Sequence, residues 1–382
     1  MGSFLRFAII VNVVRTIVCL DFGNETFFNQ THRQSREFPF YSVGRIANVY
    51  CMGSNGLSGT CQIRGECAAN GGIASGSCNS ITFQAVCCVY VNTCGGSGSN
   101  NITYFQNSGY PAAYNGGGSC IYTVVPPDTT ICQLRIDFSS FTLSQPDGNG
   151  ICVVDSLTVT GTSSPVQIIC GDNNGQHIYV SFSGTTNIIL TIATTGATSF
   201  NRVWNLQLSL ISCTSAYLAP RGCLQYYQAI AGEVLSLNYG AAANPAANGI
   251  GLIGTRQLAN SNYGICIRPA AGQCSVTYNL PTGDPFAFTM TGDATVITTA
   301  MLGTAGVGMQ GTACTTDYLI IPNPIGIPND RFCGLGLPAG ITSNTKPFVL
   351  NYITNSDDNP DVANRGFRLE YSQNACAIPA AG

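Results

Sequence analysis

The side chains that could serve as a catalytic nucleophile or base are few and lie in unsuitable surroundings. The chain has two histidines, His32 and His177, and His177 belongs to the segment Gln176-His177-Ile178-Tyr179. A serine hydrolase needs a histidine near a serine in a tight glycine-rich turn, but Gly-x-Ser-x-Gly does not occur. The His-Glu-x-x-His pattern of zinc hydrolases is also missing. We therefore predict that the protein is not an enzyme and that His177 is structural.

The cysteines are the most numerous side chains with a chemistry of their own, with 19 in 382 residues. An apolar stretch at residues 7–14 follows Arg6, and although Arg15 interrupts it, this pattern is typical of a secretory signal peptide, predicted over residues 1–20. Its removal takes Cys19 away and leaves 18 cysteines, an even number. In an oxidising compartment disulfides are favoured over zinc ligation. We expect a secreted, extracellular glycoprotein.

Charge is scarce, and this restricts the classes of partner. Only 9% of residues are charged, the net charge is −3 and Lys346 is the single lysine. Without a basic surface there is no electrostatic reason to expect nucleic acid as a partner. No second apolar segment is long enough to span a membrane. Three N-x-Ser/Thr sequons give the predicted glycosylation sites, Asn24, Asn29 and Asn101.

The elements that position these side chains follow from an internal repeat. Residues 21–50 form a polar, cysteine-free leader, and residues 51–88 contain six cysteines among many glycines. Two further sets of six follow, and the last two cysteines of each set are 43 residues apart, Cys170 to Cys213 and Cys333 to Cys376. Cys-x-x-Asp-x-Leu, Cys-Gly and Asn-Arg also recur at matching offsets. We predict two repeated domains, at residues 89–216 and 217–378.

Each repeat has the alternation of β-strands. Leu134, Ile136 and Phe138 alternate with polar residues after Cys132, and Val276, Tyr278 and Leu280 do so after Cys274. A period of two indicates strands with one buried face, and Asp-Gly, Asn-Gly and Gly-Gly pairs separate them as turns. No stretch of 12 residues has a convincing helical period. The predicted fold is all-β, with an antiparallel sandwich or jelly roll in each repeat.

The repeat resembles the CUB domain, a secreted jelly-roll β-sandwich. The similarity rests on Cys152-Val153-Val154-Asp155-Ser156-Leu157 and Cys314-Thr315-Thr316-Asp317-Tyr318-Leu319, on the later Cys-Gly, and on an aromatic last strand after Asn201-Arg202 and Asn364-Arg365. Tandem CUB proteins secreted by arthropods are the most similar. The resemblance implies two disulfides in each repeat, with one extra pair in each: Cys94–Cys120, Cys152–Cys170 and Cys132–Cys213, then Cys223–Cys266, Cys314–Cys333 and Cys274–Cys376.

The six-cysteine segment is similar to the clip domains that precede arthropod immune proteases. Gly59-Thr60-Cys61, Cys67 and Val86-Cys87-Cys88 carry this likeness, although the stretch from Cys67 to Cys78 is short for the family. Spacing alone does not select among the possible pairings of six cysteines. The clip resemblance implies Cys51–Cys87, Cys61–Cys78 and Cys67–Cys88.

Many CUB domains bind calcium through a Glu, the Asp of Cys-x-x-Asp and a later Asp, and then offer an acidic site to a lysine of a partner. The resemblance implies Asp317 and Asp357 as ligands in the second repeat, with Asp358 and Asp361 nearby, whereas Thr291 replaces the Glu. In the first repeat Asp155 is the matching ligand, but Ser144 replaces the Glu and Thr194-Thr195 the later Asp. Carboxylate oxygens are what calcium requires. Calcium is the one cofactor we expect, in the second repeat before the first.

The sequence thus predicts a non-catalytic extracellular protein that binds protein or glycan partners through loops at one end of a sandwich. A second hypothesis is a regulator of an extracellular clip-type protease cascade, in which the six-cysteine segment docks a protease. A third is a structural component of a matrix or cuticle.

Overall fold

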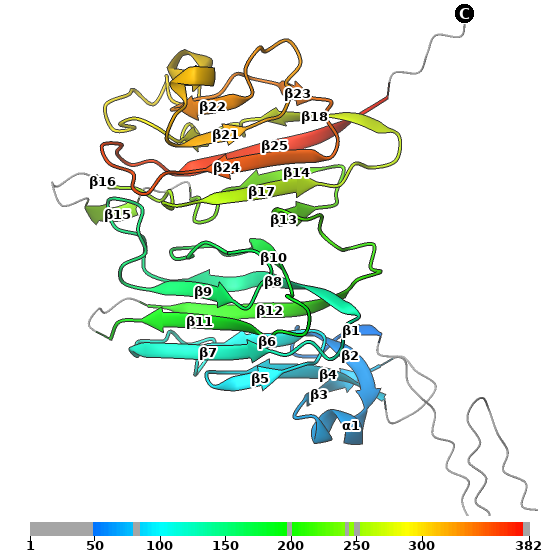
Figure 1. Ribbon diagram of the computed structural model, residues 1–382. Coiled ribbons are helices and arrows are strands. Elements are labelled where there is room, and N and C mark those ends of the chain that lie inside the picture. The colour runs from blue at the N-terminus through cyan, green and yellow to red at the C-terminus, as the bar shows by residue number, and fades with distance from the viewer. Residues whose placement is uncertain (1–48, 79–84, 197–200, 241–243, 248–252, 377–382) are drawn as a thin grey trace, which may run out of the picture. The chain divides into compact units, whose positions relative to one another are not determined.

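A computed structural model describes residues 49–78, 85–196, 201–240, 244–247 and 253–376. The predicted signal peptide, nearly all of the predicted leader, Asn24 and Asn29 lie outside the described residues. The prediction of an all-β fold is confirmed, because the described chain has one six-residue α-helix and two short 3-10 turns among its strands (Figure 1). In this part of the chain no helix has the length and apolar character needed to cross a membrane.

The six-cysteine segment is a small antiparallel sheet with one helix. Its strands come from residues with many glycines and cysteines, so the disulfides Cys51–Cys87, Cys61–Cys78 and Cys67–Cys88 supply the cross-links that its small core needs. The elements are β1 (Tyr50–Met52), β2 (Ser58–Ile63), α1 (Arg64–Ala69), β3 (Ile73–Ser77) and β4 (Ala85–Asn92).

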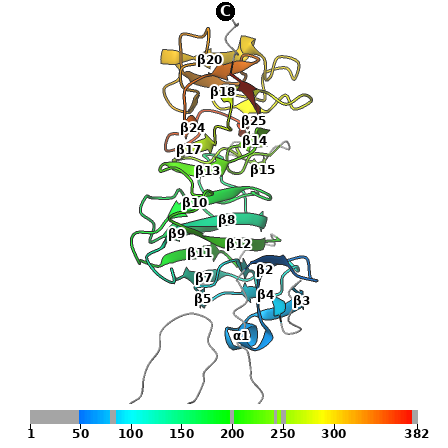
Figure 2. The same cartoon turned by 90° about the vertical axis from the view of Figure 1, so that its right-hand side faces the viewer.

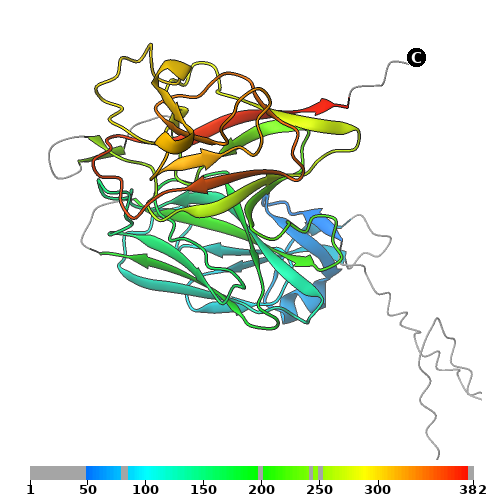
Figure 3. The ribbon, with the colours of Figure 1, turned by 45° about the horizontal axis from the view of Figure 1, so that its top comes forward.

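Strand β4 joins the six-cysteine segment to the first repeat within one sheet. Its first half pairs with β2, as in Thr60 opposite Cys88, and its second half pairs in parallel with the first repeat, where Val91 lies opposite Tyr104. The blue strands of the segment therefore continue the sheet of the cyan and green strands (Figure 3). The six-cysteine segment therefore shares a β-sheet with the first repeat and is not connected to it by a linker alone.

The first repeat is a sandwich of two sheets. One sheet continues from β4 in the order β6-β12-β8-β10, and the other has the order β5-β7-β11-β9. The alternation predicted after Cys132 is present, since Leu134, Ile136 and Phe138 are fully buried in β8. The strands are β5 (Gly96–Gly98), β6 (Thr103–Gln106), β7 (Gly118–Val124), β8 (Ile131–Thr142), β9 (Ser156–Thr160), β10 (His177–Ser181), β11 (Ile188–Thr194) and β12 (Val203–Ser212).

The second repeat is a larger sandwich built on the same plan. Its sheets have the orders β13-β17-β24-β21-β22-β20 and β14-β25-β18-β23, and its last strand β25 pairs with β18 as β12 pairs with β8. Edge strand β13 lies beside β10 of the first repeat (Figure 2). The backbone oxygen of Tyr226 in β13 lies 3.0 Å from Nε2 of His177 in β10. The strands are β13 (Cys223–Tyr227), β14 (Ala231–Leu235), β15 (Asn244–Ala247), β16 (Ile253–Gly254), β17 (Asn262–Ile267), β18 (Gln273–Asn279), β19 (Phe288–Thr289), β20 (Gly308–Gln310), β21 (Tyr318–Ile320), β22 (Arg331–Gly334), β23 (Ile341–Ser343), β24 (Phe348–Ile353) and β25 (Gly366–Ala375), with 3-10 turns η1 (Ala305–Val307) and η2 (Gly311–Ala313).

Three disulfides cross-link each sandwich and hold its end loops. Cys132–Cys213 ties β8 to the residue after β12, and Cys274–Cys376 does the same for β18 and β25. Cys152–Cys170 and Cys314–Cys333 anchor the loops that carry Asp155 and Asp317. The nine bridges join the pairs given above, the remaining two being Cys94–Cys120 and Cys223–Cys266.

Candidate metal centre

Asp317 lies at the end of the second sandwich, directly before β21. The disulfide Cys314–Cys333 fixes the chain just ahead of it, and the Asp317 side chain is only 2% exposed. The backbone N–H of Asn355 donates to its Oδ1 over 2.7 Å. Thr291, at the position where the resemblance expects a Glu, donates its hydroxyl to the backbone oxygen of Asp317 at 3.2 Å.

Two more carboxylates join Asp317 from the loop between β24 and β25. One carboxylate oxygen from each of Asp317, Asp358 and Asp361 lies within 4.8 Å of the others. Asp317 and Asp358 are buried and Asp361 is half-buried. No salt bridge among the described residues involves any of the three. This cluster of buried acidic groups could hold a metal ion.

The electrostatics of the cluster favour a cation. Burial raises the pKa of Asp317 to about 7, and the negative charges of Asp361 and Asp357 add to the rise while the Asn355 amide opposes it. Burial likewise raises the pKa of Asp358 well above the usual carboxyl value; hydrogen bonds from the side chains of Thr255 and Gln257 oppose the rise, and the charges of Asp317 and Asp361 add to it. The pKa of Asp361 is also raised, mainly by burial. Burial therefore deprives each carboxylate of the water that would stabilise its negative charge. A metal cation bound between the three carboxylates would stabilise the charged forms instead.

Asp358 keeps one oxygen unused. Its Oδ1 accepts a hydrogen bond from Gln257 Nε2 over 3.0 Å, whereas its Oδ2 is buried and has no hydrogen-bond partner. The side chain is only 4% exposed, so water does not readily satisfy this oxygen. A hard cation such as calcium or magnesium takes oxygen ligands of this type.

Asp357 takes a different role from the one expected at the sequence level. Its Oδ1 accepts the backbone N–H of Asn359 at 3.2 Å, and its Oδ2 lies 3.4 Å from the hydroxyl of Ser356. The carboxylate thus closes a turn of its own loop, and Asp358 and Asp361 stand in the cluster in its place. The physical reason lies in the loop conformation, which buries Asp358 against Gln257 and leaves Asp357 half-buried beside Asn359 and Ser356.

The matching aspartate of the first repeat already has a cation. Asp155 Oδ2 lies 2.7 Å from Arg202 Nε, and both side chains are fully buried. Arg202 Nη2 also donates to the backbone oxygen of Thr195 at 2.8 Å, and the N–H of Ser144 donates to Asp155 Oδ2 at 2.9 Å. The guanidinium supplies the positive charge at this position, so the geometry does not support Asp155 as a calcium ligand.

The arginine of the second Asn-Arg pair has a different neighbour. The guanidinium carbon of Arg365 lies 3.5 Å from the ring centre of Phe286. The same dipeptide therefore places its arginine on a carboxylate in one repeat and on an aromatic ring in the other. Among the described residues, no salt bridge gives Asp317 a counterpart to the Asp155–Arg202 pair.

His177 and Asn101 are the other singled-out residues within the described chain. His177 is 8% exposed, and its Nε2 lies 3.0 Å from the carbonyl oxygen of Tyr226. This packing is structural. Asn101 is exposed, and its Oδ1 accepts the backbone N–H of Leu210 at 3.0 Å.

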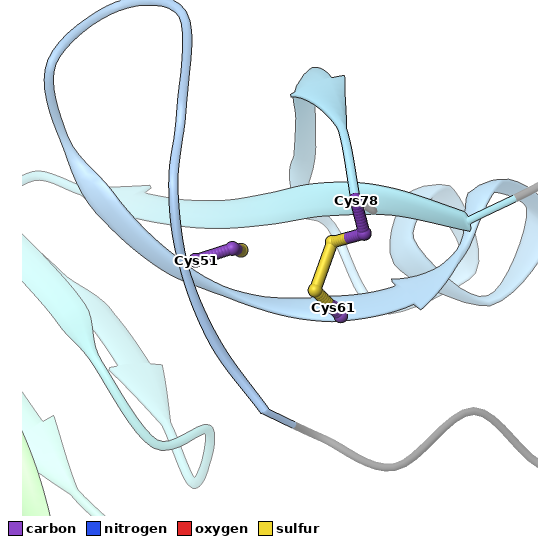
Figure 4. A group of neighbouring side chains, drawn as sticks. All are labelled: Cys51, Cys61 and Cys78. Carbon is purple, nitrogen blue, oxygen red and sulfur yellow. A yellow bond between two sulfur atoms is a disulfide. The ribbon is translucent and has the colours of Figure 1, made fainter. Parts of the chain in front are cut away.

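A second group of possible metal ligands consists of Cys51, Cys61 and Cys78 (Figure 4). Cys61 and Cys78 are joined to each other, and Cys51 is joined to Cys87. Metals bind the thiolate form of cysteine. These oxidised sulfurs are therefore cross-links rather than ligands.

Several solved structures are similar to this chain, each at low sequence identity. Among solved structures, the chain is similar to the CUB1-EGF-CUB2 domains of rat MASP-1, at 13% identity over 74% of this chain and 99% of that one, with a TM-score of 0.25. It is also similar to the MASP-1 CUB2 domain bound to Ca2+, at 16% identity over 30% and 98%, with a TM-score of 0.26. The extracellular region of zebrafish Gpr126/Adgrg6 matches at 13% identity over 79% and 37%, with a TM-score of 0.26. No curated protein sequence matches significantly.

The family models cover both repeats. Residues 94–208 match the CUB domain, and residues 220–374 match the animal CUB domain. The chain therefore belongs to the CUB family and carries two CUB domains in tandem.

Proposed function

We propose that the protein is a secreted binding protein whose second CUB domain binds calcium through Asp317, Asp358 and Asp361. CUB domains are non-catalytic modules that mediate protein interactions. The observation that carries the proposal is the unpartnered, buried Oδ2 of Asp358 beside two other carboxylates. A bound cation would offset their mutual repulsion and fix the loop between β24 and β25.

The ordered loop then serves as the binding surface. Calcium takes more oxygens than three carboxylates provide, so part of its coordination is left to backbone oxygens and water. A partner with an exposed lysine or arginine fits beside the remaining negative charge, which Asp357 increases at the rim. The proposed partner is therefore an extracellular protein with a basic side chain at its contact surface.

Isothermal titration calorimetry of the full chain with calcium chloride measures calcium binding and so tests the metal site. We expect one ion per chain with a Kd on the order of 10⁻⁴–10⁻³ M, as in extracellular modules. Asp358→Asn and Asp317→Asn should each abolish the binding. Asp357→Asn is the matched control, because it removes the same charge from the same loop but from outside the cluster, and it should retain binding within a few-fold. Absence of binding by the wild-type chain at millimolar calcium would disprove the site.

The partner is tested by capture from extracellular fluid on immobilised wild-type chain and on Asp358→Asn. Proteins retained by the wild type should be released by a calcium chelator and should not be retained by the variant. If the captured proteins stay bound in the presence of the chelator and also bind Asp358→Asn, the binding surface does not depend on calcium.

A further inference from the structure

A turn of the first CUB domain contacts the loop that carries the candidate metal ligands. The backbone oxygen of Asn149 accepts the N–H of Asp358 at 3.0 Å, and the oxygen of Gly150 accepts the N–H of Ala259 at 2.9 Å. Both acceptors belong to the segment 147–151, between β8 and β9. The main chain of a proposed ligand is thus held by a residue of the other domain.

The turn has a fixed shape. Asp147 Oδ1 accepts the backbone N–H groups of Asn149 at 3.0 Å and Ile151 at 2.9 Å, and the N–H of Gly150 donates to the Asp147 oxygen at 3.1 Å. Gly150 has a φ of +78°, in the region that favours glycine. A side chain there would also meet the second domain, because a Cβ would lie 2.7 Å from the backbone oxygen of Gln257 and 3.0 Å from the nitrogen of Ala259.

The same contact also reaches the carboxylate of Asp358. Gln257, whose backbone Gly150 touches, donates its Nε2 to Asp358 Oδ1 at 3.0 Å and to the Met290 oxygen at 3.0 Å. The first domain therefore acts on Asp358 by two routes, directly on its main chain and through Gln257 on its side chain. A shift of the turn would move both.

The turn is part of a longer polar seam between the domains. Asn238 of the second domain is fully buried and donates its backbone N–H to Asn173 Oδ1 at 2.7 Å and its side chain to Gln145 Oε1 at 2.9 Å. Its Oδ1 accepts the N–H of Asp172 at 2.8 Å. Gln145 is two residues before Asp147, so the seam fixes the chain that leads into the turn.

We infer that the turn 147–151 of the first domain positions the metal centre in the second domain. Metal binding is then coupled to the packing of the two domains against each other. This inference rests on the proposed calcium site. Because coupling is reciprocal, displacing the turn lowers calcium affinity, and bound calcium stabilises the first domain in its place.

The affinity arm of the test is calcium titration of full-length Gly150→Ala. Its added Cβ collides with Gln257 and Ala259, so we expect the Kd to rise at least about fivefold, the lower end of usual coupling between sites. Gly184→Ala is the matched control, because Gly184 is in the same domain with a φ of +61° but a Cβ there meets nothing within 4 Å. It should bind calcium as the wild type does.

The second experiment tests the coupling without a substitution in the turn 147–151. Trp204, the single tryptophan, is fully buried in the first domain, so its fluorescence follows the unfolding of that domain. Calcium chloride should raise the melting temperature seen by Trp204 in the wild type but not in Asp358→Asn.

The outcomes separate the two proposals. Measurable calcium binding with an unchanged Kd in Gly150→Ala, or with no shift of the Trp204 transition, overturns the coupling and leaves the calcium site standing. No calcium binding by the wild type overturns both.

Discussion

Replacing Arg202 by methionine should destabilise the first CUB domain strongly, because it removes the only cation beside Asp155 among the described residues. The side chains of both residues are fully buried, and Arg202 Nε lies 2.7 Å from Asp155 Oδ2. Methionine has a similar length and keeps the packing, but it leaves a buried carboxylate with only backbone donors, from Ser144 and Thr195. Leaving one partner of a buried ion pair uncompensated costs about 3–5 kcal/mol.

The double variant Asp155→Asn/Arg202→Met isolates the charge effect. It removes both charges and still presents an oxygen that can accept the Ser144 N–H. Its loss should be about 1–2 kcal/mol, chiefly from the Thr195 oxygen that Arg202 no longer satisfies. The single variant Asp155→Asn, which removes the carboxylate charge opposite the buried guanidinium, should resemble Arg202→Met and completes the double-mutant cycle.

Trp204 fluorescence during thermal unfolding measures these effects in the domain concerned. For a domain of this size the single variants should melt at least about 10 °C below the wild type. Calcium should not restore Arg202→Met to the wild-type melting temperature, because the first domain has Thr194 and Thr195 where the later acidic ligand would stand. The reasoning fails if Arg202→Met stays within about 1 kcal/mol of the wild type, or if the double variant is no more stable than the singles.

Two further predictions use the same fluorescence signal. Burial, aided by the nearby charge of Arg135 and opposed by that of Asp137, lowers the pKa of His177 to about 4, so the unfolded chain binds the proton first and stability falls as pH drops below about 6.5. Between pH 7 and pH 5 the wild type should lose about 2 kcal/mol more than His177→Gln, and parallel pH profiles would contradict this. The variant Cys132→Ala/Cys213→Ala opens a bridge with a separation of 81 residues, and the entropy of the unfolded chain predicts a loss of about 4 kcal/mol in a denaturant titration. A loss under about 1 kcal/mol would argue against that account.

The sandwiches were predictable from the sequence because their signals are local or repeated. Period-two alternation places Leu134, Ile136 and Phe138 on one face, and the matching cysteine offsets define two copies of one unit. The shared sheet of the six-cysteine segment was not predictable in this way. The parallel pairing of β4 with β6 joins residues separated by a loop, and no alternation in either strand specifies its neighbour.

The place of the acidic cluster could be predicted from the sequence, but not all the residues that form it. Asp317 follows from its position after Cys314, which the disulfide and the strand fix. Asp357, Asp358 and Asp361 lie within one turn-rich loop, where the direction of each side chain depends on the backbone of that loop. Sequence similarity favoured Asp357, whereas the Asn359 N–H draws that carboxylate into a turn.

The matching aspartates of the two domains, Asp155 and Asp317, have different charged neighbours. The Asn-Arg pair recurs at the same offset from the last cysteine, so the sequence presents it as one structural feature. In the first domain the arginine of this pair, Arg202, forms a buried ion pair with Asp155. This cation is part of the chain, so a chelator cannot remove it. In the second domain Arg365 lies on Phe286, and two extra aspartates gather at Asp317 instead. Arg202 is a covalently attached cation, so the charge of Asp155 is balanced whatever the solution contains. In the proposed calcium site the charge would instead be balanced by an ion from solution, and the order of the loop between β24 and β25 would then depend on the calcium concentration. The hydrogen bonds of turn 147–151 to Asp358 and Ala259 link the domain with the internal ion pair to the domain with the proposed calcium site.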